Sequence, residues 1–443
     1  MSTPRPGHRL ARGIQRVTAS ALGPYQSAVV RIGFSGTFLL FLLRELPHRH
    51  EMYGPDAPWR WDLAQQLISG NQAFTVLMWS DSAFWFETVY ALALISSLLL
   101  MLGWHTRAVS VLFMAGVLSL QNRSIFIGDG GDNVIHLMAI YLVLTRCGQV
   151  WSLDARRARR REAAEVGGGE TVGRRVPGEA DGIVLWVVLG TVLIGATVGG
   201  GLGGTVWVPL LLWALWTGQG AWWAVNRYAP RSELRTLLDV IANLAHNATL
   251  VVIMAEVCLI YATAGWYKIQ GSRWQDGTAL YYPLKLEYFT PWPALSGLLA
   301  SSGVMVMVLS YATVIVQVAF PFTLFNRRVK NVLLVAMICE HAGIALLLGL
   351  PFFSMAMITA DAVFLPTAFL VWLGGRASLG RQRLFRRRSF RERSFRGRSF
   401  RGRGRVPAPR AAGGGAVGGA VGGAGGGVEA AESGDDGTPT LVG

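Results

Sequence analysis

Long apolar segments recur along this chain, separated by short polar and basic stretches. We expect membrane-crossing helices at 26–43, 84–103, 107–120, 133–147, 182–200, 205–224, 248–267, 304–325, 332–350 and 352–373. The pattern predicts an all-α fold, a polytopic helical bundle with about ten transmembrane helices. Such a chain is expected in the cell membrane as a multi-pass protein.

The stretches between the apolar segments differ in character. Residues 44–83 are amphipathic and contain Trp59, Trp61 and Trp79, which favours helices that lie in the membrane interface as a candidate lid. The charged, Gly-rich linker at about 155–181 predicts a disordered loop. The hairpin expected at 182–224 follows this loop.

Both ends of the chain are basic. The net charge is +15, and the excess lies in short loops, in residues 1–25 and in the tail 376–443, which runs from Arg/Ser/Phe repeats into Gly and Ala. The positive-inside rule explains this distribution and places both termini in the cytoplasm. We expect the disordered tail to bind anionic lipid headgroups rather than nucleic acid.

The resulting topology places several segments together on the non-cytoplasmic side. They are the interfacial stretch 44–83, the loop 128–133, the loop 268–303 and the turn at 350–351. The three cysteines are far apart in the sequence, so neither a disulfide framework nor a metal site is predicted.

A single lysine stands at the end of the apolar segment 248–267, directly before an aromatic loop. Lys268 is flanked by Trp266 and Trp274. A charged amine inside hydrocarbon costs about 2.5–3.5 kcal/mol on insertion scales. Lys268 is therefore either an anchor that reaches the interface or, in a desolvated pocket, a general base. Position alone leaves both interpretations open.

Two ionisable residues interrupt the apolar segment 332–350. Glu340 and His341 are adjacent there, and ionisable residues inside spans usually face an interior cavity and mark function. We expect His341 to be a second catalytic residue, against the alternative that the pair only ties helices together. Further polar atoms at membrane depth come from Arg31, Glu256 and Gln317. A pairing of Arg31 with Glu256 or Glu340 is one arrangement open to them.

The Gly-rich loop Gly128-Asp-Gly-Gly-Asp132-Asn133 precedes the segment 133–147. Its carboxylates are not spaced as in an EF-hand and no closing glutamate follows, so we expect no metal. A turn in which Asp132 or Asn133 caps the next helix accounts for these residues.

The stretch from Tyr261 to Gly265, followed by Lys268, Trp274-Gln-Asp-Gly277 and Tyr281, resembles the core of vitamin K-dependent gamma-carboxylase and its bacterial relatives, the horizontally transferred transmembrane (HTTM) domain proteins. The arginine in the first span, the Asp132-Asn133 pair, Trp151-Ser-Leu-Asp154 and the stretch from His341 to Met355 follow in the order of that family. The resemblance covers most of residues 20–375.

In the carboxylase, the lysine that matches Lys268 deprotonates reduced vitamin K. Oxygen then converts the quinol into a strong base, which removes a proton from a glutamate so that carbon dioxide can add. The resemblance implies Lys268 and His341 as catalytic residues, and a quinone pocket formed by Asn133, Asp132, Trp274, Asp276, Tyr281, Tyr282 and Arg31. The carboxylase has a histidine directly after the asparagine, whereas this chain has Val134, with His136 two positions later.

The resemblance implies a lyase that acts as a carboxylase or epoxidase, with reduced vitamin K or menaquinol as cofactor, a peptide as substrate and no metal. One alternative is a non-catalytic membrane component that assists maturation or export of a peptide. A transporter is a further alternative, although the spans show no inverted repeat of broken helices.

Overall fold

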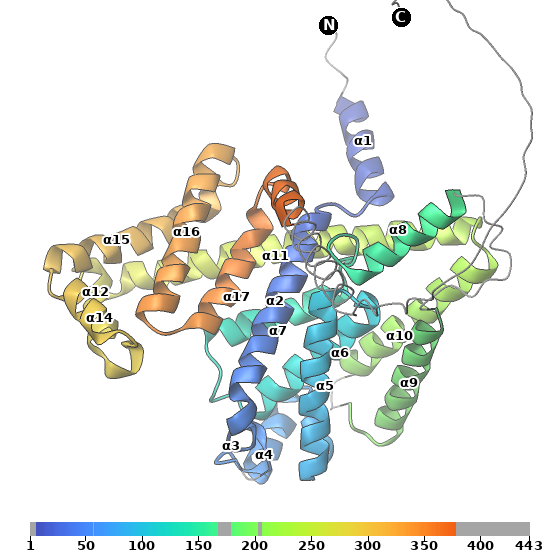
Figure 1. The fold of residues 1–443 in the computed structure, drawn as a ribbon, viewed down its shortest axis with the longest axis horizontal. Helices are drawn as coiled ribbons and strands as arrows, with labels where there is room; N and C mark the ends of the chain where they lie inside the picture. The colour runs from blue at the N-terminus through green and yellow to red at the C-terminus, as the bar shows by residue number, and fades with distance from the viewer. Residues whose placement is uncertain (1–5, 56, 167–178, 203–205, 378–443) are drawn as a thin grey trace, which may run out of the picture. The chain divides into compact units, whose positions relative to one another are not determined.

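The computed structural model describes residues 6–55, 57–166, 179–202 and 206–377, in which the helices are joined by turns and loops and no β-strand occurs (Figure 1). The α-helices are α1 Pro6–Ala19, α2 Pro24–Glu45, α3 Arg49–Tyr53, α4 Trp61–Asn71, α5 Ala83–Leu102, α6 Thr106–Arg123, α7 Gly130–Val143, α8 Leu153–Val166, α9 Glu179–Val198, α10 Trp207–Tyr228, α11 Glu233–Gln270, α12 Ser272–Gln275, α13 Tyr281–Lys285, α14 Pro293–Ala300, α15 Gly303–Ala319, α16 Arg327–Leu347 and α17 Pro351–Asp361. Short 3₁₀ helices are η1 Leu46–His48, η2 Leu77–Trp79, η3 Glu287–Phe289, η4 Phe320–Thr323 and η5 Ala362–Phe364. The all-helical fold class is confirmed.

Six helical stretches in the described residues are long and apolar enough to cross a membrane, or seven if one bent pair counts as a span. They are Pro24–Tyr53, Ala83–Leu102, Ala180–Val198, Glu233–Gln270, Gly303–Thr323 and Arg327–Leu347, with Pro351–Phe364 plus Thr367–Ala377 as the bent pair. The chain is thus a multi-pass helical membrane protein. Ten spans are not confirmed, because the segments predicted at 107–120, 133–147 and 205–224 form α6, α7 and α10, which are not among these candidates.

The last span expected from the sequence, 352–373, is not a continuous helix. The chain bends by 116° between α17 and the helix Thr367–Ala377. Pro366 lies at the bend and has no backbone N–H with which to continue the helix. The Gln26 side chain donates to the carbonyl of Leu365 at 2.9 Å and to the Thr367 hydroxyl at 3.0 Å. Another helix therefore supplies hydrogen-bond partners at the break.

The linker expected to be disordered at 155–181 is helical at its start. Residues 153–166 form α8, whose Ala, Arg and Glu residues have high helix propensity and whose first turn contains Asp154. Residues 167–178 and the predicted disordered tail after residue 377 lie outside the described residues.

Serine side chains cap the N-termini of α11 and α15. Ser232 accepts a hydrogen bond from the backbone N–H of Arg235 at the start of α11, and Ser302 accepts one from Met305 at the start of α15. Such caps satisfy amide groups that have no partner within the helix. They define where the two helices that carry Lys268 and Gln317 begin.

The central packing unit joins α2, α5 and α17. Figure 1 shows α2 between α5 and α17, both of which it contacts. Gly33 allows a close approach of α2 to α17, since a Cβ built there would lie 2.2 Å from Cγ2 of Thr359 on α17. Phe34 and Phe38 of α2 are almost fully buried in the same core. Small and aromatic residues of α2 therefore fix α17, which lies beside the candidate site.

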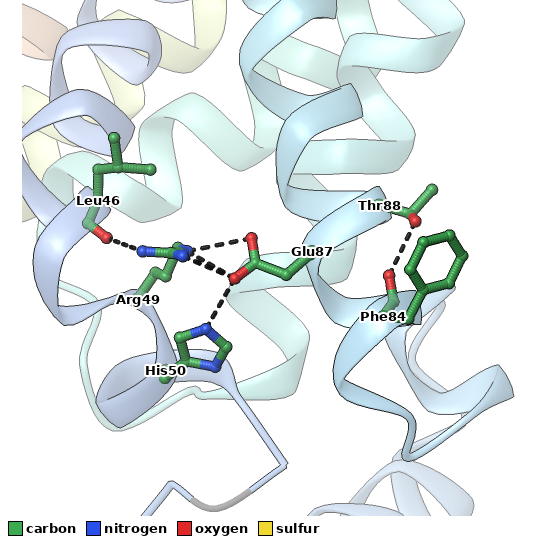
Figure 2. A network of polar contacts seen from close by, with 6 residues as sticks. All are labelled: Leu46, Arg49, His50, Phe84, Glu87 and Thr88. Carbon is green, nitrogen blue, oxygen red and sulfur yellow. Dashed lines mark hydrogen bonds and ion pairs between the residues drawn. The ribbon is translucent and has the colours of Figure 1, made fainter.

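The segment predicted to hold interfacial helices, 44–83, does form short helices, including α3 and α4. Figure 2 shows how its first part is tied to α5: Arg49 donates to both carboxylate oxygens of Glu87, and the His50 ring lies against the same carboxylate. The shortest contacts of Arg49 and His50 with Glu87 are both 2.7 Å. An ion pair thus holds α3 against the start of α5.

Candidate functional site

Lys268 lies in the last turn of α11 and is partly buried. Its Nζ donates to Oε1 of Gln317 on α15 at 2.8 Å and lies 5.3 Å from the centre of the Trp274 ring. An amine over an aromatic face is stabilised by the ring quadrupole. The structure therefore brings Lys268 and Trp274 together and gives Lys268 a hydrogen-bond partner in Gln317.

Gln317 connects Lys268 to a carboxylate. Its Nε2 donates to Oε1 of Glu340 on α16 at 2.5 Å. One amide side chain thus bridges an amine and a carboxyl group from two different helices. Because the amide both accepts and donates, the three side chains of Lys268, Gln317 and Glu340 form a short polar chain among apolar helices.

His341 follows Glu340 directly but contacts a different helix. Its Nε2 lies 3.0 Å from the hydroxyl of Tyr261 on α11, and its ring packs edge to face against Phe353 of α17 at 5.7 Å between centres. The Nδ1 atom of His341 is buried and has no partner among the described residues. Adjacent residues on α16 therefore build two polar contacts to α11, one through Gln317 and one direct.

The loop before α7 caps that helix. Asp129, not Asp132 or Asn133, is the N-cap residue: its side chain accepts from the backbone N–H groups of Gly131 and Asp132, and the Asp132 side chain accepts from that of Asp129. This reciprocal capping box satisfies amide groups at the helix start. Asn133 is exposed and its side chain makes no hydrogen bond within the described residues.

The capping loop lies outside the candidate spans, and burial raises the pKa of Asp132 to about 6.

Phe353 lies between the capping loop and His341. A Cβ built on Gly131 would lie 2.7 Å from Cα of Phe353, the residue that packs on the His341 ring. Phe353 thus separates α7 from His341, and no direct contact of His341 with Asn133 is formed in the described part of the chain. Nδ1 of His136, two positions after Val134, lies 3.1 Å from Oε1 of Gln121 on α6.

Three of the predicted pocket residues line an open hollow beside α12 and α15. The hollow has a volume of about 460 Å³ and is lined by Arg273, Asp276, Gly277, Thr278, Tyr281, Tyr282, Ala300, Gly303, Val306 and Met307. The guanidinium of Arg273 lies 5.1 Å from the centre of the Tyr282 ring. Hydrogen bonds from Thr278 lower the pKa of Asp276. Lys268 and Trp274 do not line the hollow; α12, four residues long, separates Lys268 from Asp276 in the chain.

The Arg31 side chain bonds to backbone carbonyls and does not line the hollow beside α12. It is fully buried, and its guanidinium donates to the carbonyls of Leu100, Met101, Cys147 and Trp151 at 2.6–3.2 Å. Two of these carbonyls, those of Leu100 and Met101, belong to the last turn of α5, where carbonyl groups lack the usual partner within the helix. The Leu100 carbonyl also accepts from the backbone N–H of the capping residue Gly103. The pairings with Glu256 or Glu340 are not formed, because backbone carbonyls use the donors of Arg31.

The sequence did not identify one buried acid in this region. Asp361 ends α17, and its fully buried carboxyl oxygens have no hydrogen-bond partner among the described residues. The signal available was a lone carboxyl residue inside an otherwise apolar segment. The pairing of Lys268 with Gln317 was also not predictable, since it depends on how α11 and α15 pack.

In the described part of the chain, no group of three or more His, Cys, Asp or Glu side chains is arranged to hold a metal ion. No protein-family model, no curated protein and no solved structure matches this chain.

Proposed function

We propose that this chain is an HTTM-class membrane enzyme that removes a proton from a reduced naphthoquinone, with Lys268 as the base. The position of Lys268 is the observation that carries the proposal. Its amine is partly buried at a helix end, over an aromatic ring, and in one hydrogen-bonded chain with a carboxyl group. A structural anchor at the interface needs none of these partners.

Glu340 can compensate the charge that forms when Lys268 acts as a base. When Lys268 accepts a proton it becomes an ammonium ion, and the carboxylate of Glu340, connected through Gln317, compensates that charge. Paired groups of this kind are the usual form in which charges occur at membrane depth. His341, held by Tyr261, is the candidate for orienting or stabilising oxygen near the same helix pair.

The hollow beside α12 supports an aromatic ligand. Its volume of about 460 Å³ is in the range of small-molecule sites, and its lining combines tyrosines, aliphatic side chains and one arginine. Arg273, Tyr281 and Tyr282 would hold the ring system of a quinol such as menaquinol. The bound quinol would supply an acidic hydroxyl group and reducing equivalents. Lys268 does not line the hollow, so the quinol hydroxyl group would have to extend beyond it for Lys268 to take the proton.

We further propose the ten-span topology with both termini in the cytoplasm. The distribution of arginines supports it, together with the alternation of the observed helices. The contacts of Arg31 support this topology as well. They bring the first half of α2 together with the end of α5 and the residues that follow α7, so these three parts lie on the same side, as the topology requires. In this topology the end of α11 and the loop before α7 face away from the cytoplasm.

One observation favours a second function. The amine of Lys268 already has a hydrogen-bond partner in Gln317, and Gln317 in turn binds Glu340. A chain closed in this way also suits a protein without catalytic activity, in which the three residues lock α11, α15 and α16 together. This alternative is a membrane component that assists maturation or export of a peptide.

The enzyme and the non-catalytic component can be distinguished by whether the protein turns over a reduced quinone. Purified protein in lipid nanodiscs would be supplied with reduced menaquinone and oxygen, and the quinone epoxide measured by chromatography. A positioned general base contributes about 10²–10⁴-fold to rate, so Lys268→Ala should reduce turnover at least by about 10²-fold. Arg327→Ala, at the exposed start of α16, is the matched loss of a cation and should retain turnover. Equal turnover in Lys268→Ala would exclude the base; no turnover by folded wild-type protein would favour the accessory function.

A further inference from the structure

A second polar chain lies beside the one that contains Lys268. Asp361, Tyr261 and His341 come from α17, α11 and α16, and their exposed fractions are 0%, 1% and 2%. The Tyr261 hydroxyl contacts Nε2 of His341 at 3.0 Å. The Asp361 carboxyl neighbours the same hydroxyl. A phenol thus lies between a carboxyl group and an imidazole.

The Asp361 carboxyl lacks what a buried charge requires. Neither oxygen has a hydrogen-bond partner of good geometry in the described residues, although an unpaired buried carboxylate is strongly unfavourable. A proton on the carboxyl removes this charge and provides a donor for the Tyr261 oxygen. At the other end, Nδ1 of His341 is also buried and without a described partner. Both ends of the chain are thus titratable groups with a buried polar atom that has no partner among the described residues.

We propose that Asp361, Tyr261 and His341 form a buried proton-transfer chain. In the first state the Asp361 carboxyl donates to the Tyr261 oxygen, and the Tyr261 hydroxyl donates to Nε2 of a neutral His341. Transfer moves the Asp361 proton to the Tyr261 oxygen while the proton of Tyr261 moves to Nε2. The second state holds a carboxylate, a neutral tyrosine and an imidazolium, so one proton has crossed from α17 to α16 and no electron has moved.

The surroundings of Asp361 contain few other ionisable groups. Besides Tyr261, the charge that acts on it comes from Glu340 on α16. The ammonium of Lys330, also on α16, donates to the carbonyl of Phe364 beyond the end of α17. Where α2 and α7 approach α17, two of the residues in close contact with it are glycines, Gly33 and Gly131, which have no ionisable side chain. The chain does not require Lys268 to be a base, so it stands independently of the proposed function.

Infrared spectroscopy of the full-length protein in nanodiscs tests the chain. Protein labelled with carbon-13 at the side-chain carboxyl of aspartate should show, at neutral pH, a carboxylic acid C=O band at lower wavenumber than unlabelled protein. Asp361→Asn should lose this band, and Glu340→Gln should retain it. In Tyr261→Phe the band should move to higher wavenumber, because its hydrogen bond is lost. Its exchange in D₂O should slow several-fold, because the route to His341 is cut.

The isotope assignment is made on wild-type protein, so it holds even if Asp361→Asn fails to fold. Absence of a labelled carboxylic acid band in wild-type protein would overturn the proposal. So would a band that persists in folded Asp361→Asn, or an exchange rate that is unchanged in Tyr261→Phe.

Discussion

Gln317 is the residue that connects the amine and the carboxyl group of the candidate site. Lys268 and Glu340 each bind it and make no direct ion pair with each other in the described residues. Hydrogen bonds between membrane helices average about 0.6 kcal/mol in double-mutant cycles, with a maximum near 1.7. The energetic coupling of Lys268 with Glu340 should fall in this range and should depend on the amide.

A double-mutant cycle measures this coupling. We expect Lys268→Met and Glu340→Gln to be non-additive in the free energy of unfolding by about 0.6–1.7 kcal/mol. The same cycle in a Gln317→Leu background should be additive. Coupling that persists without Gln317 would mean that the two charges interact directly, contrary to the hydrogen-bonded chain.

His105 gives the protein a pH dependence outside the spans. The residue lies between α5 and α6 at φ 43°, and its Nε2 is buried without a described partner. Burial lowers the pKa of His105, so below about pH 6.5 the unfolded chain binds more protons than the folded chain. Stability should therefore be full above this pH and fall as the pH decreases towards and through the lowered value.

His105→Asn should flatten the fall in stability below about pH 6.5, since asparagine tolerates the left-handed conformation and does not titrate. Thermal unfolding followed between about pH 5 and 7.5 provides the measurement. His48→Asn is the control, because the His48 side chain is 63% exposed, and it should keep the wild-type dependence. A His105→Asn profile that superimposes on the wild-type profile would contradict the assignment.

Residue positions were predicted unevenly, for physical reasons. Lys268, Trp274 and His341 could be chosen as candidates because a charge or an aromatic cluster in an apolar segment is visible in the sequence. Arg31 was recognised as unusual, but its partners are backbone carbonyls, which every sequence contains. Asp361 was missed although it is a lone carboxyl residue in the middle of the predicted span 352–373, because its neighbours Tyr261 and Glu340 come from other helices.

At the scale of elements, α2 packs closely against α17, which in turn contacts the site helix α16. A Cβ on Gly33 would lie 2.2 Å from Cγ2 of Thr359 and 2.4 Å from its hydroxyl oxygen. Overpacking of this kind costs about 1–3 kcal/mol. Gly33→Ala should therefore destabilise the protein by that amount, and Thr359→Ser should relieve part of the loss in the double variant.

Gly343→Ala is the matched control for Gly33→Ala. Gly343 lies in α16, and a Cβ there would meet nothing within 4 Å. Alanine at such a helix position is favourable by about 0.5–1 kcal/mol relative to glycine. Equal effects of the two substitutions on the free energy of unfolding would show that α2 and α17 are not in close contact.

Helix existence was predictable and helix continuity was not. Apolar length identifies α2, α5, α11, α15 and α16, because burial of a backbone in lipid requires a helix. The bend at Pro366 exposes backbone and hydroxyl groups whose partner, Gln26, is distant in sequence. The helix α8 forms because its Ala, Arg and Glu residues have high helix propensity, although its charged composition had suggested disorder. The amphipathic α1, with Arg9, Arg12 and Arg16 at helical spacing, was read only as a basic terminus.

At the scale of the whole molecule, the proposed topology places the end of α11 outside the cytoplasm. A cysteine at Ser272 in a cysteine-free background should react with an impermeant maleimide in intact cells. A cysteine at Arg231, exposed at the other end of α11, should react only after lysis. The reverse pattern would invert the topology, and labelling of both sites in intact cells would mean that α11 does not cross the membrane.

The central claim is that the amine of Lys268 takes a proton from a bound quinol. The most direct measurement is chemical rescue of Lys268→Ala by small primary amines in the oxygen-dependent quinol assay. We predict that added amines restore turnover and that the restored rate rises with amine basicity, as for a general base. Lys268→Ala turnover equal to that of wild-type protein, or a loss of turnover that no amine restores in a variant shown to bind the quinol, would contradict the account.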